Sequence, residues 1–346
     1  MAQCVTVIGD GAMGTVCAQI LAEKGVRVKV WGFDGAYVQQ MAAARENVKY
    51  LPGFKLHDNI SVTADDAAAF KDCDLIVAAV PTQFIRGVMK RLQPHVPATV
   101  PIVNIAKGIE VSTLKRPTQI ILEALGGARV RPVGVLSGPN IASEIARKLP
   151  ATMVVAADAD GLPVESHADD ALAKRVQELF NTSYVRVYRN TDVIGVEFAG
   201  ALKNVIAIAA GILDGMRAGN NAKAALLTRG LVEITRLGVA VGAKAETFMG
   251  LAGLGDLVTT CVSPEGRNRS FGERIGKGET VDAVLKSMVG VVEGVPTTKG
   301  VVQLAKEKGV EMPICEGLHE VLFKGIEPRA ALVELMSREL KREVEK

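Results

Sequence analysis

The chain has 346 residues, of which 48% are hydrophobic, and this is enough apolar material for two domains with separate cores. Its net charge of +3 argues against a nucleic-acid-binding protein or one held on an anionic membrane. The five cysteines are scattered without C-x-x-C spacing, which is typical of a reducing compartment. We find no signal peptide and no apolar run of the ~20 residues that a membrane span needs, so we expect a cytoplasmic protein.

The first predicted strand, residues 5–8, ends in a glycine-rich turn. Gly9, Gly11 and Gly14 follow it with G-x-G-x-x-G spacing, and a helical pattern begins at Thr15. Such a turn lets the backbone approach a pyrophosphate and aims the N-terminus of the helix at its charge. The glycines alone are also compatible with a tight turn. The strand before them and the helix after them favour a dinucleotide-binding βαβ unit.

Further short apolar runs alternate with helical patterns as far as Arg189. Several are apolar throughout, as expected of strands that are covered on both faces of a parallel sheet. Helical patterns between them, such as residues 172–180, would supply right-handed crossovers. These patterns predict an α/β domain over residues 1–189 with a doubly wound, Rossmann-like and mostly parallel sheet. Its other expected strands cover residues 26–31, 74–80, 100–105, 133–138, 151–157 and 184–188.

The pattern changes after about Asn190. Long runs rich in Ala, Leu and Val and punctuated by Gly replace the short strands, for example over residues 193–216 and 222–242. We therefore predict an all-α helical domain over residues 190–346. A site would lie in the cleft between the two domains, outside the carboxyl ends of the strands.

The end of the second strand bears on the choice of cofactor. An acidic residue about 20 positions after the glycines normally binds the ribose hydroxyls of NAD at this place. Asp34 lies 20 residues after Gly14, but Gly32 interrupts the strand end, so Asp34 can equally be a turn residue. No Arg lies in this turn to pair with a 2′-phosphate. The choice between NAD and NADP therefore stays open.

Two lysines and a turn are candidate site residues. Lys107 follows the strand 100–105 and would point into the cleft, unless it is a solvated loop lysine. Gly138 and Asn140 lie in a turn that closes the next strand and opens a helix. Lys203 lies inside the longest apolar helical stretch, where an unpaired ammonium is costly to bury. Because partial desolvation lowers the pKa of a lysine, Lys203 suits proton transfer.

A second polar group follows in the helical domain. Asp256 lies where a glycine-rich loop enters an apolar run, and it can also be a helix N-cap. Arg267 and Asn268 follow Gly266 in a turn. The always-charged fork of Arg suits an anionic phosphate, although a solvated basic turn is an alternative.

The histidines lie outside all these clusters, and we expect them at the surface or in loops. A dehydrogenase built on this chain would therefore use Lys rather than a His–Asp pair as its acid–base group. No metal-binding spacing is present either, so we expect no metal. The four histidines are His57, His95, His167 and His319.

Taken in chain order, the motifs resemble the NAD(P)-dependent sn-glycerol-3-phosphate dehydrogenases of the bacterial type. The long helix with GALKN and the AGLGDL loop carry the resemblance more specifically than the glycines do. The matching segments span positions 7 to 299 and are VIGDGAMGT, VWGFD, NIAKGIE, SGPNIASEIA, GVEFAGALKNVIAIAAGILDG, GLAGLGDLVTTC, GRNRSFG and VVEGVPTTK.

The resemblance implies an oxidoreductase that interconverts dihydroxyacetone phosphate and sn-glycerol 3-phosphate with NAD or NADP and supplies glycerophospholipid synthesis. It implies no metal, no nucleic acid and no membrane span, and it allows a homodimer. Lys203 would be the proton donor and acceptor, with Lys107 and Asp256 beside it. The implied substrate-binding residues are Lys107, Gly138, Asn140, Lys203, Asp256, Gly266, Arg267 and Asn268. The implied cofactor-binding residues are Gly9, Gly11, Ala12, Met13, Gly14, Phe33, Lys107, Ala142, Arg267, Val291 and Glu293.

Three positions depart from the family's pattern. Gly266 stands where Ser or Thr is frequent, and Asn140 stands where Thr is frequent. Phe33 stands where His or Arg often follows Trp-Gly, so it offers no partner to a 2′-phosphate. Only a more distant cation, such as Lys29 or Arg45, could reach a 2′-phosphate bound at the end of the second strand. We therefore expect NADH to be used at least as well as NADPH.

Two other functions are compatible with parts of the pattern. A related reductase of a β-hydroxyacid or ketopantoate also uses a helix Lys and Asn, but the Gly266–Asn268 turn and the AGLGDL loop favour a phosphorylated triose. A non-catalytic dinucleotide sensor would keep the glycines and would not need Lys107, Lys203 and Asp256 together.

Overall fold

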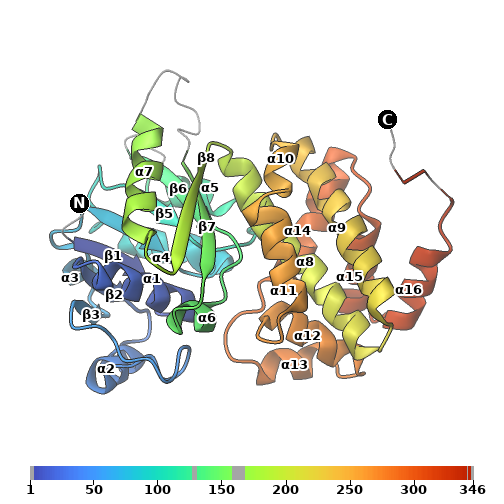
Figure 1. Ribbon diagram of the computed structural model, residues 1–346, viewed down its shortest axis with the longest axis horizontal. Helices are drawn as coiled ribbons and strands as arrows, with labels where there is room; N and C mark the ends of the chain where they lie inside the picture. The colour runs from blue at the N-terminus through green and yellow to red at the C-terminus, as the bar shows by residue number, and fades with distance from the viewer. Residues whose placement is uncertain (1–3, 127–130, 158–167, 341, 344–346) are drawn as a thin grey trace.

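The computed structural model describes residues 4–126, 131–157, 168–340 and 342–343. An α/β part built on one sheet lies beside a part made of helices (Figure 1). The last strand of the sheet ends at Asn190, and the first helix of the helical part begins at Val193. His167 lies outside the described residues.

The sheet has eight strands in the order β3-β2-β1-β4-β5-β6-β7-β8. All neighbouring strands are parallel except β6 and β7, which are antiparallel. This confirms the predicted doubly wound, mostly parallel sheet. The strands are β1 (Cys4–Ile8), β2 (Arg27–Trp31), β3 (Ile60–Thr63), β4 (Leu75–Ala78), β5 (Ile102–Asn104), β6 (Val133–Ser137), β7 (Ala151–Ala157) and β8 (Val185–Asn190).

The strand β3 is not among those predicted from the sequence. This strand has four residues at the edge of the sheet, and only Ile60 is buried. A short edge strand with one buried side chain lacks the continuous apolar run that reveals the central strands.

Helices cover both faces of the sheet. One core joins the sheet to α1 and α7, and another joins it to α4 and α5. Because both faces are buried, β1 and β4 carry apolar or small side chains at nearly every position. The helices of this part are α1 (Ala12–Glu23), α2 (Gly35–Ala44), α3 (Asp66–Phe70), α4 (Thr82–Leu92), α5 (Pro117–Ala124), α6 (Ala142–Ala146) and α7 (Ala168–Phe180).

The helical part is built around α8 (Val193–Gly215), which the other helices surround (Figure 1). Among the described helices, α8 alone is long and apolar enough to cross a membrane, but 89% of its most apolar window is buried inside the protein. It therefore packs as the central core helix. The others are α9 (Asn220–Ala240), α10 (Ala245–Phe248), the π-helical turn η1 (Leu251–Gly255), α11 (Asp256–Val262), α12 (Arg267–Gly276), α13 (Val281–Ser287), α14 (Gly294–Lys308), α15 (Pro313–Lys324) and α16 (Pro328–Met336).

Helix α12 crosses α8 at very close range. A Cβ added to Gly211 on α8 would clash with the backbone of Arg269, and one added to Gly272 on α12 would clash with the backbone of Ile208. Glycines on both helices are therefore needed for this crossing. The crossing places the start of α12 against the middle of α8, where the predicted site residues lie.

Candidate active site

The glycine-rich turn connects β1 to α1 and forms an open cradle. Gly9 has φ of +115°, a conformation that favours glycine, and a Cβ at Gly14 would clash with the carbonyl oxygen of Gly9. Within the part of the chain that the structure describes, a Cβ at Gly11 would meet no atom within 4 Å, and no side chain caps α1. Free N–H groups in the first turn of a helix beside open space suit a phosphate. Ala12 and Met13 begin this helix.

Three charged side chains from different elements meet between the two parts. Lys107 follows β5, Lys203 lies on α8, and Asp256 begins α11. The two carboxylate oxygens of Asp256 lie 2.6 Å from the Lys107 ammonium and 2.9 Å from the Lys203 ammonium. Lys107 also donates to the carbonyl oxygen of Gly138 at 2.9 Å. The structure thus brings together residues that lie up to 149 positions apart.

Burial governs the charge state of this cluster. Lys203 has 6% and Asp256 3% of its side chain exposed. Burial lowers the pKa of Lys203 to about 8, although Asp256 opposes the shift. For Asp256 burial opposes ionisation, but the two lysines outweigh it and hold its pKa below the usual range. The arrangement therefore offers a lysine that can gain and lose a proton near neutral pH beside a fixed carboxylate.

The alternative that Asp256 is a helix N-cap is wrong. The N-cap of α11 is Gly255, and no side chain caps the helix. The Asp256 carboxylate is instead used by the lysines and by the Thr260 hydroxyl, which donates to it at 3.2 Å. Sequence reasoning missed Thr260, which accepts a hydrogen bond from Lys203 at 2.5 Å. Its spacing of four residues from Asp256, on the same helix face, is the signal that could have found it.

An amide chain joins the predicted phosphate-binding residues to the lysines. Asn268 on α12 donates to the side-chain oxygen of Asn204 at 2.9 Å, and Asn204 donates to the carbonyl oxygen of Lys107 at 3.4 Å. Arg267 is exposed and donates to the carbonyl oxygen of Val291 at 3.1 Å. An exposed guanidinium beside this buried chain can receive an anion at the edge of the cluster.

Gly266 and Asn140 are two further predicted substrate-binding residues. Gly266 is the N-cap of α12, and a Cβ there would lie 3.0 Å from the carbonyl oxygen of Thr260. There is thus little room for the Ser or Thr that the family pattern favours. With its side-chain oxygen and nitrogen exchanged, the Asn140 amide donates to the carbonyl oxygens of Pro139 at 3.1 Å and Thr152 at 3.3 Å.

The end of β2 is open. Phe33 is 67% exposed, while the Asp34 carboxylate caps α2 by accepting the N–H groups of Ala36 and Tyr37. Of the two interpretations of Asp34, a ribose-binding residue and a turn residue, the structure agrees with the turn residue. Lys29 and Arg45 are bonded to backbone carbonyls elsewhere, so neither is free to reach back.

Glu293 links the start of α14 to the α/β part. One of its carboxylate oxygens accepts the N–H of Thr82 at 3.0 Å, and the other is buried beside Gly108 with no hydrogen-bond partner among the described residues. Burial raises the pKa of Glu293 to about 7. Ala142 begins α6, and its neighbour Ser143 donates a hydrogen bond to Glu265 of the helical part.

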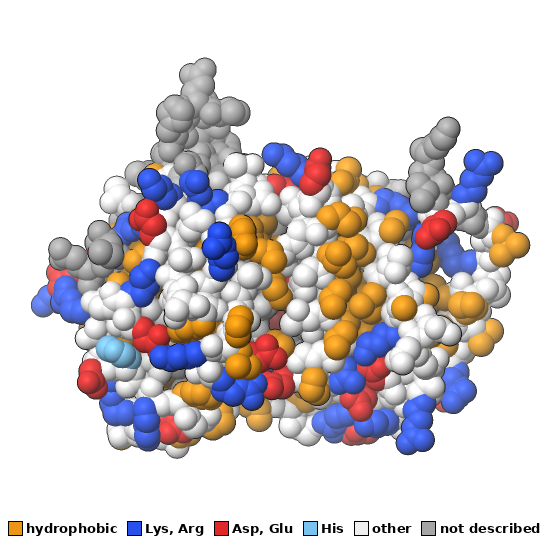
Figure 2. All heavy atoms as spheres, viewed as in Figure 1, with side chains coloured by type: hydrophobic (Ala, Val, Ile, Leu, Met, Phe, Trp, Pro, Cys, Tyr) orange, Lys and Arg blue, Asp and Glu red, His pale blue; other side chains and the backbone are white. Residues whose placement is uncertain are grey.

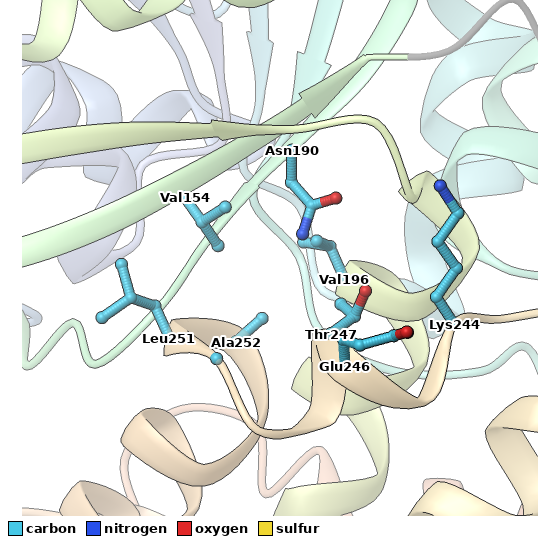
Figure 3. Close-up of a pocket in the computed structure, with 9 residues that line it drawn as sticks. Val154, Asn190, Val196, Lys244, Glu246, Thr247, Leu251 and Ala252 are labelled. Carbon is cyan, nitrogen blue, oxygen red and sulfur yellow. The ribbon is translucent and has the colours of Figure 1, made fainter.

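A cavity of about 230 Å³ has a lining that does not include the charged cluster (Figure 3). Its lining includes Val154, Asn190, Lys244 and Leu251, and none of the predicted catalytic residues. It borders the η1 turn that precedes Asp256. Across the described ranges, no group of three His, Cys, Asp or Glu side chains could hold a metal ion.

Comparisons with known proteins match both parts of the chain. Residues 4–162 match the family model for the N-terminus of NAD-dependent glycerol-3-phosphate dehydrogenase, and residues 192–333 match the model for its C-terminus. The chain is 47% identical over 343 residues to a glycerol-3-phosphate dehydrogenase (NAD(P)+) of Geobacter sp. (strain M21), covering 99% of each chain. It is 46% identical over 340 residues to one of Chlorobium limicola, covering 98% of this chain and 99% of that one.

Solved structures agree with these matches. A glycerol-3-phosphate dehydrogenase from Coxiella burnetii superposes with a TM-score of 0.90 at 34% identity, covering 97% of this chain and 99% of that chain. A ketopantoate reductase from Ralstonia eutropha superposes with a TM-score of 0.57 at 14% identity, covering 95% and 99%. At that identity the second likeness concerns the fold alone.

Proposed function

The chain belongs to the family of NAD-dependent glycerol-3-phosphate dehydrogenases, and from this premise we propose that it interconverts dihydroxyacetone phosphate and sn-glycerol 3-phosphate with NAD(P)H. The observation that carries the proposal is the buried cluster in which Lys203 and Lys107 share the Asp256 carboxylate between the two parts. Glycerol 3-phosphate made in this way would supply glycerophospholipid synthesis.

The glycine-rich turn fits a dinucleotide, because it leaves open space at Gly11 and free N–H groups at the start of α1. When bound, NAD(P)H supplies the hydride that reduces the substrate carbonyl carbon. The residues that would hold it are Gly9, Gly11, Ala12, Met13, Gly14, Phe33, Lys107, Ala142, Arg267, Val291 and Glu293.

The chain's own residues would handle the substrate and the proton. Arg267 and Asn268 would bind the phosphate, and this would point the carbonyl carbon of the substrate into the cluster. The Lys203 ammonium would stabilise negative charge developing on the carbonyl oxygen and give it a proton. Asp256 would hold Lys203 in place. In the oxidative direction, neutral Lys203 would take the proton back.

Asn268 is a proposed phosphate-binding residue that is already held in place by its neighbours. The buried amide of Asn268 is held by Asn204 and by the N–H of Gly294 at 3.0 Å, so its position is fixed before the substrate arrives. Fixed donors gain more from an incoming phosphate because less side-chain freedom is lost on binding. The other residues that would line the substrate are Gly138, Asn140, Gly266 and Lys107.

The competing functions are less well supported. The ketopantoate reductase shares only the fold, and the Gly266–Asn268 turn beside Lys203 favours a phosphorylated substrate. A dinucleotide sensor would have no use for a lysine whose burial lowers its pKa to about 8. The full chain should therefore turn over a ketone and should prefer one that carries a phosphate.

The direct test follows NADH oxidation by the loss of absorbance of the reduced nicotinamide. Dihydroxyacetone phosphate should support turnover, while ketopantoate and unphosphorylated dihydroxyacetone should not. Turnover with ketopantoate alone would establish the reductase alternative. Dinucleotide binding without turnover of any ketone would establish the sensor. A second series with NADPH measures the cofactor preference.

The domain boundary at 189/190 remains a proposal about how the chain divides. It is supported by β8 ending at Asn190 and by α8 beginning at Val193, which leaves only two residues between the sheet and the core helix. Residues 1–189 and 190–346 would then carry the dinucleotide site and most of the substrate site, respectively. Limited proteolysis that cuts first within 189–193 would support this division.

Assembly and location are further proposals. Figure 2 shows hydrophobic side chains gathered over the helical half, and Val232 and Val239 on α9 are 38% and 48% exposed. Such a face would suit a homodimer. Light scattering after gel filtration should then give twice the monomer mass of 36.5 kDa. The scattered, unpaired cysteines and the modest net charge fit a cytoplasmic enzyme.

A further inference from the structure

Asp10 lies in the glycine-rich turn, and its side chain reaches the end of the neighbouring strand. A Cβ added to Gly32 would come 2.8 Å from Asp10 Oδ2 and 3.1 Å from its Cγ. The carboxylate therefore lies directly against Gly32, the residue that follows β2. β1 and β2 pair in parallel as far as Ile8 and Trp31, so the turn after one strand meets the end of the other. An acidic group thus stands where β2 ends, although it comes from β1.

The buried side chain of Asn47 holds the backbone of this turn in place. Asn47 is fully buried, and its side chain donates to the Asp10 carbonyl oxygen and to the Thr15 hydroxyl, both at 2.7 Å. The Tyr37 hydroxyl donates to the other end of the Asn47 amide at 2.5 Å. A buried amide with both ends bonded fixes the turn. The position of the Asp10 carboxylate is therefore set before any ligand binds.

The Asp10 carboxylate has unused acceptor capacity. No other residue in the described ranges donates a hydrogen bond to it, and its own N–H is the one backbone group that favours its charge. Burial raises the pKa of Asp10, and the nearby Lys49 ammonium only partly offsets the effect. A partly buried carboxylate without donors is a site that gains from a ligand's hydroxyl groups.

The other carboxylate at this strand end is already in use. Asp34 Oδ1 accepts the N–H groups of Ala36 at 3.0 Å and Tyr37 at 3.2 Å, and these bonds begin α2. Turning Asp34 toward a ligand would leave both N–H groups without their cap.

We propose that Asp10, rather than Asp34, binds the adenosine ribose hydroxyls of the dinucleotide and selects NAD against NADP. The proposal rests on the proposed function only in that the chain binds a dinucleotide. A carboxylate accepts hydrogen bonds from a free 2′-hydroxyl and repels a 2′-phosphate, which offers no donor and carries about two negative charges. Asp10 thereby takes the role that the end of β2 usually supplies.

The cations around this site determine what happens without the Asp10 charge. The Lys49 ammonium lies 4.9 Å from the centre of the Tyr50 ring, and the Arg91 guanidinium lies 5.2 Å from the centre of the Phe33 ring. Arg91 is already paired with Asp66 at 2.8 Å, so Lys49, whose charge acts on Asp10, is the cation that would favour an added phosphate once the carboxylate is neutral. Removing the Asp10 charge should therefore improve NADPH binding as well as weaken NADH binding.

The test compares two identical chemical changes, Asp10→Asn and Asp34→Asn, in the full chain. Dissociation constants are measured by calorimetry for ADP-ribose and for its 2′-phosphate, which carry the adenosine end without nicotinamide. NADH and NADPH are then measured without substrate. For Asp10→Asn we expect the ratio of the two affinities to move ~10-fold or more toward the 2′-phosphate. For Asp34→Asn we expect a change within ~2-fold, because Asn also caps helices.

A ratio that moves in Asp34→Asn and not in Asp10→Asn would overturn the proposal, and so would an unchanged ratio in both. Asp10→Ala provides a second variant if the Asn protein does not fold, and the same shift is expected from it. Because no substrate is present, failure to turn over dihydroxyacetone phosphate would overturn the proposed function and leave this result intact. If the wild-type protein bound neither nucleotide, both would be wrong.

Discussion

The two ends of the proposed site differ in how their charges are held. Between the two parts, Lys203 and Asp256 are almost fully buried and bonded to each other, and Asp256 also binds Lys107. At the end of β2, Phe33 is 67% exposed and the Asp34 carboxylate only caps a helix.

This difference separates residues that can change the rate of catalysis greatly from residues that can change only the cofactor preference. Charges that are fixed and removed from water interact strongly with a reacting group, and they need no reorganisation when charge develops on it. An exposed residue is screened by water, so its contribution is small and easily changed. We therefore expect substitutions in the buried cluster to change catalysis greatly and substitutions at β2 to change cofactor preference modestly.

The largest effect is expected for Lys203→Ala. Among the described residues, the Lys203 ammonium bonds to Asp256 and Thr260 and to none of the glycine-rich turn, so the variant should fold and bind NADH but lose kcat by ~100-fold or more. Stopped-flow or steady-state NADH oxidation measures kcat, and NADH fluorescence measures binding. Lys277→Ala removes a lysine that is 57% exposed and serves as the control. A near-normal kcat in Lys203→Ala would remove Lys203 from the mechanism.

Arg267→Ala should have the next largest effect. Losing a charge-assisted contact to the phosphate should weaken the binding of dihydroxyacetone phosphate by ~1.5–3 kcal/mol. This loss should appear mainly as a higher KM. Arg274→Ala is the matched control, since Arg274 pairs with Glu279 on the same helical part. If the affinity for the phosphorylated substrate did not change, the phosphate site would have to lie elsewhere.

The pH profile tests the buried lysine without mutation. Lys203 must be protonated to reduce the ketone, and burial lowers its pKa to about 8. The rate of reduction should therefore fall as pH rises through about 8, and the rate of glycerol 3-phosphate oxidation should rise over the same interval. Glu293, whose pKa burial raises to about 7, titrates nearby. In Glu293→Gln the fall in the reduction rate near pH 8 should persist. A rate that does not change with pH in that interval would contradict the assignment of this fall to Lys203.

Phe33→Arg probes the exposed end of the site. The new guanidinium would add a cationic partner for a 2′-phosphate, but its exposure limits the gain to roughly 1 kcal/mol, or about fivefold in the NADPH-to-NADH ratio of kcat/KM. Phe33→Gln is the neutral control. We expect the wild-type protein to use NADH at least as well as NADPH. A wild-type kcat/KM that favours NADPH ~10-fold, or 1.4 kcal/mol, would contradict this expectation.

The smallest effect is expected for Asp34→Ala. Losing the N-cap of α2 should lower the free energy of unfolding by about 1 kcal/mol, while Asp34→Asn should change it little. Urea denaturation followed by circular dichroism measures both. A kcat for Asp34→Ala far below the wild-type value would show that this residue does more than cap the helix.

Most of the α/β part could be predicted from the sequence. The central strands are apolar throughout because both faces of the sheet are buried, and β7 was predicted with its full bounds, Ala151–Ala157. The edge strand β3 was missed because only Ile60 is buried. The antiparallel pairing of β7 with β6 was also beyond the sequence, since burial on both faces produces the same pattern in either direction.

The candidate site was predicted less evenly. The apolar setting of Lys203 showed that it must pair or face a cleft, and in the structure it pairs with Asp256. The local pattern left a helix N-cap as the alternative for Asp256, because a short acidic residue before an apolar run fits an N-cap, and only the resemblance placed Asp256 beside Lys203. Thr260 and Asp10 were missed, since neither residue type in isolation indicates a site.

By itself the sequence determined the local structure of this protein: the strand, the glycine-rich turn and the helix after it, and the change from strands to helices near Asn190. These depend on the backbone preferences and apolar spacing of neighbouring residues. Only the tertiary structure decided which charged groups meet. Lys203 and Asp256 lie on different helices, and the glycine-lined crossing of α8 and α12 brings Asn268 to Asn204. Such contacts depend on how closely distant elements pack, which no local pattern records.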